Sequence, residues 1–235
     1  ILGALWRNGL PPSASFLSGK PDVFHSPSFV APHAGNAALV LTLTSSASHL
    51  LSDDSDGPAP SKEALRALLC RASAIVAVST YVARDLQEAL PGPLPPVSVV
   101  PMGVDRGRFH PPSRDGIGAP LAAHALKPGE YLLSVGTLRA WKNPLRLLEA
   151  WRGLPAGLRP RLVWVGNPHP KERDLEEAFR QAENEGFLWL RNIPNRDLPA
   201  LYSGALAFCF PSLEEGFGLP ILEAMACGTT VLTSD

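Results

Sequence analysis

Short apolar runs rich in β-branched residues alternate with helical patterns along almost the whole chain. A strand–helix–strand repeat of this kind requires parallel strands with helices on both faces, so the sequence predicts an α/β fold. The segments predicted as strands are Asp22–Phe24, Leu39–Leu43, Ala74–Val78, Val97–Val100, Tyr131–Val135, Arg161–Val165, Phe187–Leu190, Ala205–Phe210 and Thr230–Thr233. The predicted helices are Ser61–Arg71, Tyr81–Leu90, Pro144–Arg152, Lys171–Asn184, Arg196–Ser203 and Leu219–Ala226.

Two of these helices carry clear end signals. Asn143 precedes Pro144, which fits an N-cap followed by proline at the first helical position. Gly228 follows Cys227 at the end of the last helix, where a left-handed residue is favoured.

The middle of the chain has a different composition. Residues 91–128 contain nine prolines and one strand pattern, which indicates a connection between two lobes. We place the boundary near Asp105–Pro112, which gives a first lobe over 1–105, a linker and start of the second lobe over 106–128, and a second lobe over 129–235. Asp53–Pro60 is a further loop-like segment inside the first lobe.

The composition excludes several classes of protein. Of the 235 residues, 45% are hydrophobic and 18% charged, with a net charge of −1, so neither a disordered chain nor a nucleic-acid or acidic-membrane partner is expected. The three cysteines, Cys70, Cys209 and Cys227, lack the spacing of a disulfide framework or zinc site. We expect Cys209 and Cys227 to be buried thiols in a reducing compartment, and no apolar run has the ~18–20 residues that span a bilayer.

The segment that points most strongly to a function is Phe210–Gly228. A buried strand leads into a loop with Gly216 and Gly218, and a helix starts at about Leu219. Unpaired backbone N–H groups and the positive end of the helix dipole make such a start a favourable place for an anion.

Two carboxylates flank this helix start. Glu223 falls one turn into the helix, where it can accept hydrogen bonds from a diol such as ribose, and Glu215 lies eight positions earlier on the loop. As single residues they would be solvated charges, whereas the nineteen-residue pattern as a whole favours a site for a nucleotide-linked sugar.

This stretch resembles the motif E-G-F-G-L-P-x-x-E of retaining glycosyltransferases of the group 1 or family 4 type, with Glu215 and Glu223 at its ends. Other parts of the chain resemble family motifs in the same order, and the likeness runs from about Lys20 to the end. The segments that resemble family motifs are Ala77–Tyr81 (A-V-S), Val100–Phe109 (P-N-G-V-D-x-x-R-F), Ser134–Asn143 (V-G-T-L-x-x-x-K-N), Leu201-Tyr202 (L-Y) and Phe210–Ser212 (F-P-S).

The resemblance implies two Rossmann-like lobes with parallel sheets (the GT-B architecture), truncated at both ends of this chain and inactive without the missing parts. The ends, Ile1–Trp6 without an initiator Met and Thr230–Asp235, fit that expectation. The first lobe would bind the acceptor and the second the nucleotide-sugar donor.

The resemblance also implies residue roles. Glu223 would bind the donor ribose, Glu215 would act at the reacting centre as the catalytic residue, and Lys142 would neutralise the diphosphate leaving group. Ile193, in the loop before Leu198, would offer main-chain bonds to the base. The donor-binding set is Gly136, Thr137, Arg139, Lys142, Ile193, Leu198, Phe217, Gly218, Leu219, Pro220 and Glu223.

The expected reaction moves a sugar from a UDP-, GDP- or ADP-sugar to an acceptor with retention of configuration, in a mannosyltransferase-like enzyme. Neither a metal nor a cofactor is implied, since positive charge and the helix dipole can replace a metal. The acceptor would be a sugar or a lipid-linked sugar, and the location cytoplasmic with peripheral membrane contact allowed.

Three positions depart from the family pattern. Thr44-Ser45-Ser46 stands where the family has a sugar-contacting His, and Met102 replaces an Asn. Thr137 and Trp141 occupy the two places where an Arg beside the Lys is usual, so Arg139 either supplies that charge from another angle or faces solvent.

These departures keep alternatives open. One is a lobe that binds nucleotide-sugar without transferring it, and another is a sugar-nucleotide epimerase or phosphorylase of the same architecture. An NAD-dependent enzyme is disfavoured, because Ile221 stands where the dinucleotide fingerprint requires a third glycine.

Overall fold

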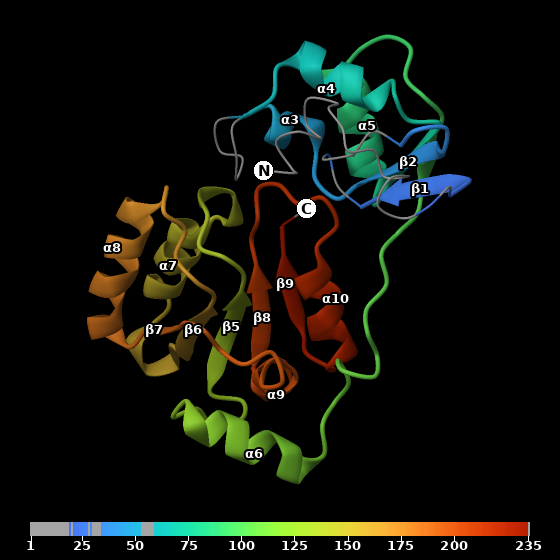
Figure 1. The fold of residues 1–235 in the computed structure, drawn as a ribbon. Helices are drawn as coiled ribbons and strands as arrows, with labels where there is room; N and C mark the ends of the chain where they lie inside the picture. The colour runs from blue at the N-terminus through green and yellow to red at the C-terminus, as the bar shows by residue number, and fades with distance from the viewer. Residues whose placement is uncertain (1–18, 20, 28, 30–33, 53–58, 235) are drawn as a thin grey trace. The chain divides into compact units, whose positions relative to one another are not determined.

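The computed structural model describes residues 19, 21–27, 29, 34–52 and 59–234. Contacts divide the chain into two compact units, Ile1–Met102 with Glu215–Phe217, and Gly103–Glu214 with Gly218–Asp235. Each unit contains one parallel sheet (Figure 1). The predicted α/β class with two parallel sheets is confirmed.

The first unit is built on a four-stranded sheet in the order β1-β2-β3-β4, with all neighbours parallel. Its core joins alternate residues of the strands to the apolar stripes of two helices, for example Leu41 in β2 with Leu65 and Leu86. The elements are β1 (Val23–Ser26), β2 (Ala38–Leu43), α3 (Ala47–Leu50), α4 (Lys62–Leu69), β3 (Ala74–Ala77), α5 (Thr80–Ala89) and β4 (Val97–Val99).

The second unit carries a five-stranded parallel sheet in the order β7-β6-β5-β8-β9. Its strands are β5 (Tyr131–Val135), β6 (Arg161–Val165), β7 (Leu188–Leu190), β8 (Ala207–Phe210) and β9 (Val231–Thr233). Its helices are α6 (Arg114–Ala123), α7 (Pro144–Arg152), α8 (Arg173–Ala182), α9 (Leu198–Gly204) and α10 (Leu219–Ala226). Short 3-10 turns are η1 (Ala140–Lys142), η2 (Ala156–Leu158) and η3 (Glu183–Glu185).

Side-chain alternation in this sheet produces two separate cores, one on each face. In β6, Val163 and Val165 belong to the core that includes α6, α9 and α10, whereas Leu162 and Trp164 belong to the core of α7 and α8. Because successive strand residues point to opposite faces, a continuous apolar run such as this one is buried on both sides.

Every predicted strand and helix is present, with small shifts at the ends. Among the described residues, two helices were not predicted, α3 and α6. The single turn of α3 is too short for an apolar period, and α6 contains Gly116, Gly118 and Pro120, which are all poor helix formers. Of the predictions, Ile1–Trp6, Lys20 and most of the Asp53–Pro60 loop (53–58) lie outside the described residues.

Both end signals are confirmed. Helix α7 starts at Pro144 after Asn143, and Gly228 adopts a left-handed conformation with φ of 78° after α10. Cys209 and Cys227 are buried, as predicted, and burial raises the pKa of each thiol to about 11.

Candidate functional site

The carboxyl edge of the second sheet has a topological switch point. From β5 the chain proceeds outward through β6 and β7, and then returns to the other side of β5 to form β8 and β9. The connections that leave β5 and β8 therefore diverge, and open parallel sheets bind ligands in the crevice formed at such a point. Gly136 directly follows β5, and Pro211 directly follows β8.

Two tryptophans on neighbouring strands fix this edge. Trp164 Nε1 donates to the Gly136 carbonyl at 2.9 Å, and Trp189 Nε1 donates to the Gly166 carbonyl at 2.8 Å. A Cβ atom at Gly166 would lie 1.9 Å from the Gly136 oxygen, so only glycine allows the two turns to pack this closely. The turn at Gly136 is thus fixed by a hydrogen bond from Trp164 and by close packing of Gly166, both distant from it in the sequence.

Lys142 lies against this turn. A Cβ atom at Gly136 would approach Lys142 Cε to 2.8 Å, which shows that the lysine stem runs directly over the glycine. The Lys142 ammonium lies 4.9 Å from the ring centroid of Phe210, the last residue of β8. The cation predicted to neutralise a diphosphate is therefore placed between the ends of β5 and β8, at the switch point.

Arg139 is buried, with 2% of its surface exposed, so the solvent-facing alternative was wrong. Its guanidinium donates to His169 Nδ1, lies 4.1 Å from the Trp141 ring centroid and has Nε 3.7 Å from Glu172 Oε1. Glu172 also accepts the Ala140 N–H at 3.1 Å. Arg139 thus ties the loop after β5 to the loop after β6, and its part in donor binding stays a prediction.

The start of α10 is at the same edge, after β8. Gly218 is its N-cap, in a left-handed conformation with φ of 86°, and no side chain caps the first turn. Pro220 has no N–H and the Ile221 N–H donates to the Gly218 carbonyl, which leaves the N–H groups of Gly218 and Leu219 as the donors of this helix end. Such donors and the dipole favour an anionic group.

Glu223 lies one turn into α10 and is half-buried. Its Oε2 accepts a hydrogen bond from the Tyr202 hydroxyl at 2.9 Å. Burial raises the pKa of Glu223, while the Tyr202 hydrogen bond and the nearby Arg108 guanidinium act in the opposite direction. A partly desolvated carboxylate with a fixed orientation is well suited to accept hydrogen bonds from a diol.

The other predicted residues of the second unit lie in loops at this edge or beside it. Ile193 follows β7 and Leu198 begins α9, and both are half-buried against the core beneath α9 and α10. Asn192, next to Ile193, donates its N–H to Asn167 Oδ1 at 3.0 Å, which joins the loops after β7 and β6. Thr137 is exposed in the loop that follows Gly136.

Glu215 and Phe217 belong to the first compact unit, although their neighbours in the sequence belong to the second. Both are half-buried, and Phe217 packs against the edge of that unit's core. The site described in the second unit therefore does not include Glu215 and Phe217. The catalytic role of Glu215 stays a prediction.

In the first unit, the Thr44-Ser45-Ser46 segment leads into α3. Ser46 is buried and its Oγ accepts the His49 N–H at 3.1 Å. The Asp85 carboxylate on α5 accepts the N–H groups of Ala47 at 2.5 Å and Ser48 at 3.0 Å. Ser46 thus serves as a helix cap, which is a structural use for one of the residues found where the family has its His.

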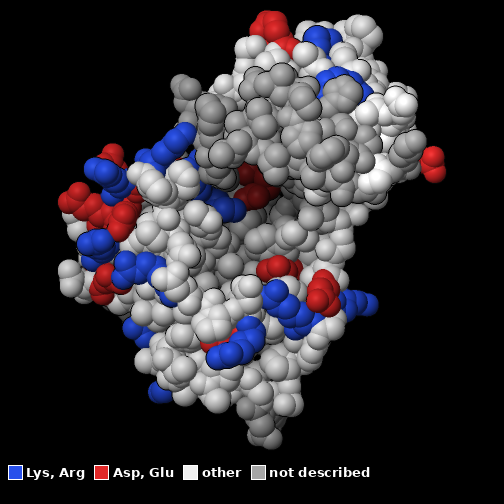
Figure 2. Space-filling model, viewed as in Figure 1, with Lys and Arg blue, Asp and Glu red and all other residues white. Residues whose placement is uncertain are grey.

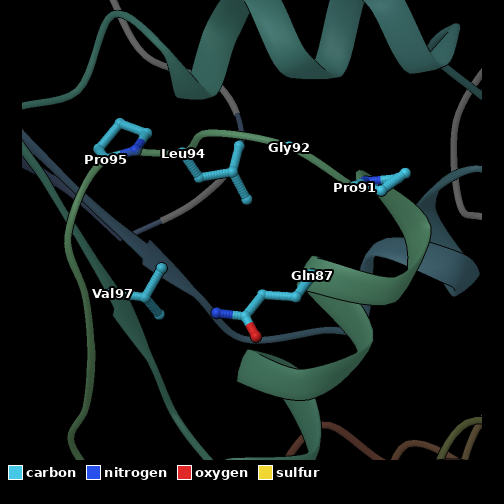
Figure 3. Close-up of a pocket in the computed structure, with 6 residues that line it drawn as sticks. All are labelled: Gln87, Pro91, Gly92, Leu94, Pro95 and Val97. Carbon is cyan, nitrogen blue, oxygen red and sulfur yellow. The ribbon is translucent and has the colours of Figure 1, made fainter.

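A surface pocket of about 450 Å³ lies elsewhere in the first unit (Figure 3). It is formed by the end of α5 and the segment that enters β4, at the amino ends of the strands, and contains none of the predicted site residues. Its lining residues are Gln87, Pro91, Gly92, Leu94, Pro95 and Val97.

Neither the surface charges nor the arrangement of possible metal ligands identifies a further site in the described residues. On the face shown in Figure 2, Lys and Arg side chains are interspersed with Asp and Glu. Within the described ranges, no three His, Cys, Asp or Glu side chains come together as metal ligands would. None of the helices in the described part of the chain has the length and apolar character needed to cross a bilayer.

Sequence reasoning did not identify two groups that support the site, Tyr202 and the tryptophans Trp164 and Trp189. Tyr202 lies within the L-Y pair already noted, but the pair by itself does not indicate which carboxylate its hydroxyl meets. The tryptophans were part of strands predicted only as apolar runs.

Two family models match the chain. The model described as Glycosyl transferases group 1 matches residues 122–235, and the model described as Glycosyltransferase Family 4 matches residues 5–108. The first match overlaps mainly with the second compact unit, and the second match mainly with the first.

Curated relatives agree with these models. The chain is 41% identical over 108 residues to the O-antigen chain mannosyltransferase B of Escherichia coli. That alignment covers 45% of this chain and 28% of the relative. It is 34% identical over 194 residues to a D-inositol 3-phosphate glycosyltransferase of Actinosynnema mirum, an alignment that covers 77% of this chain and 46% of the relative. The chain thus spans less than half the length of either relative.

Solved structures share the fold. A sucrose-phosphate synthase from Thermosynechococcus elongatus superposes with a TM-score of 0.75 at 20% identity, over 94% of this chain and 57% of that one. Anabaena HepE, solved in complex with UDP, gives a TM-score of 0.68 at 22% identity, over 84% and 53%. At these identities the likeness establishes the architecture alone.

Proposed function

Because the chain belongs to the group 1 glycosyltransferases, we propose that it takes part in moving a sugar from a nucleoside-diphosphate sugar to an acceptor hydroxyl. The observation that carries the proposal is the cluster at the switch point of the second sheet. Lys142 lies at the end of β8, the loop after β8 leads into the start of α10, and Glu223 lies one turn into that helix, an arrangement that suits a diphosphate and a ribose.

The chemistry follows from the charge that develops on the leaving group. As the bond between the sugar carbon and the diphosphate oxygen breaks, negative charge grows on the phosphate, where Lys142 and the helix dipole stabilise it. We propose retention of configuration: the acceptor oxygen bonds to that carbon from the face the phosphate leaves, and the hydroxyl proton passes to the departing phosphate oxygen.

The donor is a UDP-, GDP- or ADP-sugar in this proposal, and no cofactor takes part. The acceptor is a sugar or a lipid-linked sugar. The relatives include a mannosyltransferase and an inositol-phosphate glycosyltransferase, and HepE was solved with UDP, which supports a nucleotide-sugar donor. A cytoplasmic location with peripheral membrane contact is part of the same proposal.

A second candidate is a lobe that binds the donor without transferring sugar. It is favoured by the use of Ser46 as a helix cap where the family has a His, and by Trp141, which packs against Arg139 instead of supplying a cation. Donor binding in the absence of any transfer, by the full reading frame with its acceptor supplied, would identify this case.

The experiment that tests the proposal is calorimetric titration of the full reading frame with UDP, GDP and ADP and with their sugars. We expect one base to bind selectively, with the sugar nucleotide and its diphosphate competing for one site. A folded protein that binds none of the three would contradict the proposal.

Glu215→Gln should lower sugar transfer about tenfold, since a hydrogen bond to a charged group near the reacting centre would be lost. Affinity for the nucleoside diphosphate should stay within about twofold, because Glu215 acts on the sugar. Initial rates and titrations of the variant separate the two quantities, and Glu214→Gln, the adjacent carboxylate, is the control. An equal loss in both quantities would mean that Glu215 binds the nucleotide.

Removal of divalent ions should leave transfer unchanged, because Lys142 and the start of α10 supply the positive charge that a metal would provide. Rates measured with excess EDTA and after readdition of Mg²⁺ or Mn²⁺ check this expectation. A large loss that Mn²⁺ restores would show that the proposed metal-independent chemistry is incorrect.

A further inference from the structure

The contact between Tyr202 and Glu223 joins two helices of the second unit. Tyr202 in α9 is fully buried, and its hydroxyl lies 2.9 Å from Glu223 Oε2 in α10. The ring is held edge-on by Phe109 and Phe208, at centroid distances of 6.1 and 5.2 Å. Burial and the nearby Glu223 charge raise the pKa of Tyr202 well above its usual value, so the hydroxyl stays protonated and acts as the donor.

The two helices do not depend on this hydroxyl for their relative position. Thr229 Oγ1, just after α10, donates to the Tyr202 carbonyl at 2.7 Å. Ser203 Oγ donates to the Cys227 carbonyl at 2.9 Å. Neither bond uses the Tyr202 side chain, so we expect the loss of its hydroxyl to act on the Glu223 carboxylate and to leave the helices in place.

A carboxylate that accepts from two neighbouring hydroxyls must have the plane of its two oxygens rotated toward both of them. It has about four acceptor positions, so Oε2 can accept from Tyr202 and from a ligand together. Among the described residues, the Tyr202 hydroxyl is the one group that donates a hydrogen bond to the Glu223 carboxylate. The Tyr202 hydroxyl therefore sets the orientation of the carboxylate around its last torsion, which is otherwise broad.

We propose that Tyr202 is a positioning residue that makes Glu223 selective for a ribose carrying both of its hydroxyls. The inference rests on the proposed function, in which Glu223 binds the donor ribose. It adds a specificity role for a buried residue that does not itself reach the nucleotide.

The charged and titratable groups around Glu223 come from three segments. Tyr202 lies on α9, Arg108 lies in the segment before α6, and Cys227 ends α10. Arg108 is fixed by a 2.8 Å bond from Nη2 to the Asn195 carbonyl and by the Phe109 ring, 4.7 Å away. Because the Tyr202 hydrogen bond lowers the pKa of Glu223, loss of the hydroxyl should raise that pKa further.

The test compares Tyr202→Phe with Tyr131→Phe. Tyr131 is a matched control, since its buried hydroxyl donates to the Leu201 carbonyl of the same helix at 2.5 Å and does not contact Glu223. The ligands are whichever of UDP, GDP and ADP binds to the full reading frame, and its 2′-deoxy and 3′-deoxy forms. The ratio of ribo to deoxy affinity is taken within each preparation, so partial unfolding of a variant does not affect it.

We expect Tyr202→Phe to reduce this ratio about threefold to tenfold and Tyr131→Phe to leave it unchanged. The pH below which the nucleotide loses affinity should also rise in Tyr202→Phe and stay the same in Tyr131→Phe. An unchanged ratio and pH profile in Tyr202→Phe, or an equal change in both variants, would overturn the inference.

A third variant separates this inference from the proposed function. If Glu223→Ala abolishes the preference for ribose while Tyr202→Phe keeps it, the positioning role alone fails. If Glu223→Ala also keeps the preference, the ribose assignment of Glu223 fails, and the role of Tyr202 fails with it.

Discussion

Lys142→Ala should lower sugar transfer by about 10²–10³-fold, the cost of removing one preorganised group that stabilises transition-state charge. The ammonium lies near the Phe210 ring at the switch point, and its stem runs over Gly136. This packing holds the charge in place before the leaving group becomes more negative, so no reorganisation is needed during the reaction. The loss should fall mainly on the rate at saturating donor.

Initial rates at saturating acceptor, with donor concentration varied, measure this effect. Lys127→Ala is the control, because Lys127 belongs to the same unit and is exposed, with Glu130 3.9 Å away. Nucleoside diphosphate should bind the Lys142 variant more weakly while the corresponding nucleoside binds equally well. If transfer by the Lys142 variant equals that of the control, the lysine does not act on the leaving group.

Glu223→Ala should weaken donor binding by ~1.5–3 kcal/mol, the range for hydrogen bonds to a charged group. The carboxylate is half-buried and fixed by Tyr202, so its hydrogen bonds to a ribose form away from bulk water. Burial raises the pKa of Glu223, and a protonated carboxyl accepts more weakly. Affinity of the unmodified protein should therefore fall on acidification at a pH above the usual range of a glutamate.

Calorimetric titration between about pH 4 and 8 measures both effects, since this interval contains the ordinary glutamate pKa and the range above it. Glu149→Ala is the matched control, because Glu149 is an exposed helical carboxylate of the same unit, 70% exposed and 3.9 Å from Arg146. The acid-dependent loss should disappear in the Glu223 variant and persist in the control. Unchanged nucleotide affinity in Glu223→Ala would show that this residue does not bind the ribose.

Much of the fold follows from local patterns in the sequence. The apolar runs at Tyr131–Val135 and Arg161–Val165 are strands buried on both faces. Helix α7 begins at the predicted Pro144, and the left-handed Gly228 follows the end of α10 as predicted. Helix α6 was missed because a helix that contains Pro120 and two glycines is stabilised by packing on α9 and not by its own propensity.

The linear sequence determined which residue types are available at the carboxyl edge, because the order of strand, glycine loop and helix places Gly218, Leu219 and Glu223 within one short segment. Tertiary structure decided how they are supported. Tyr202 meets Glu223, Trp164 holds Gly136, and Arg139 is buried beside Glu172, across separations of 21, 28 and 33 residues. These contacts depend on the parallel strand order, which brings distant loops to one edge, and no local spacing encodes that order.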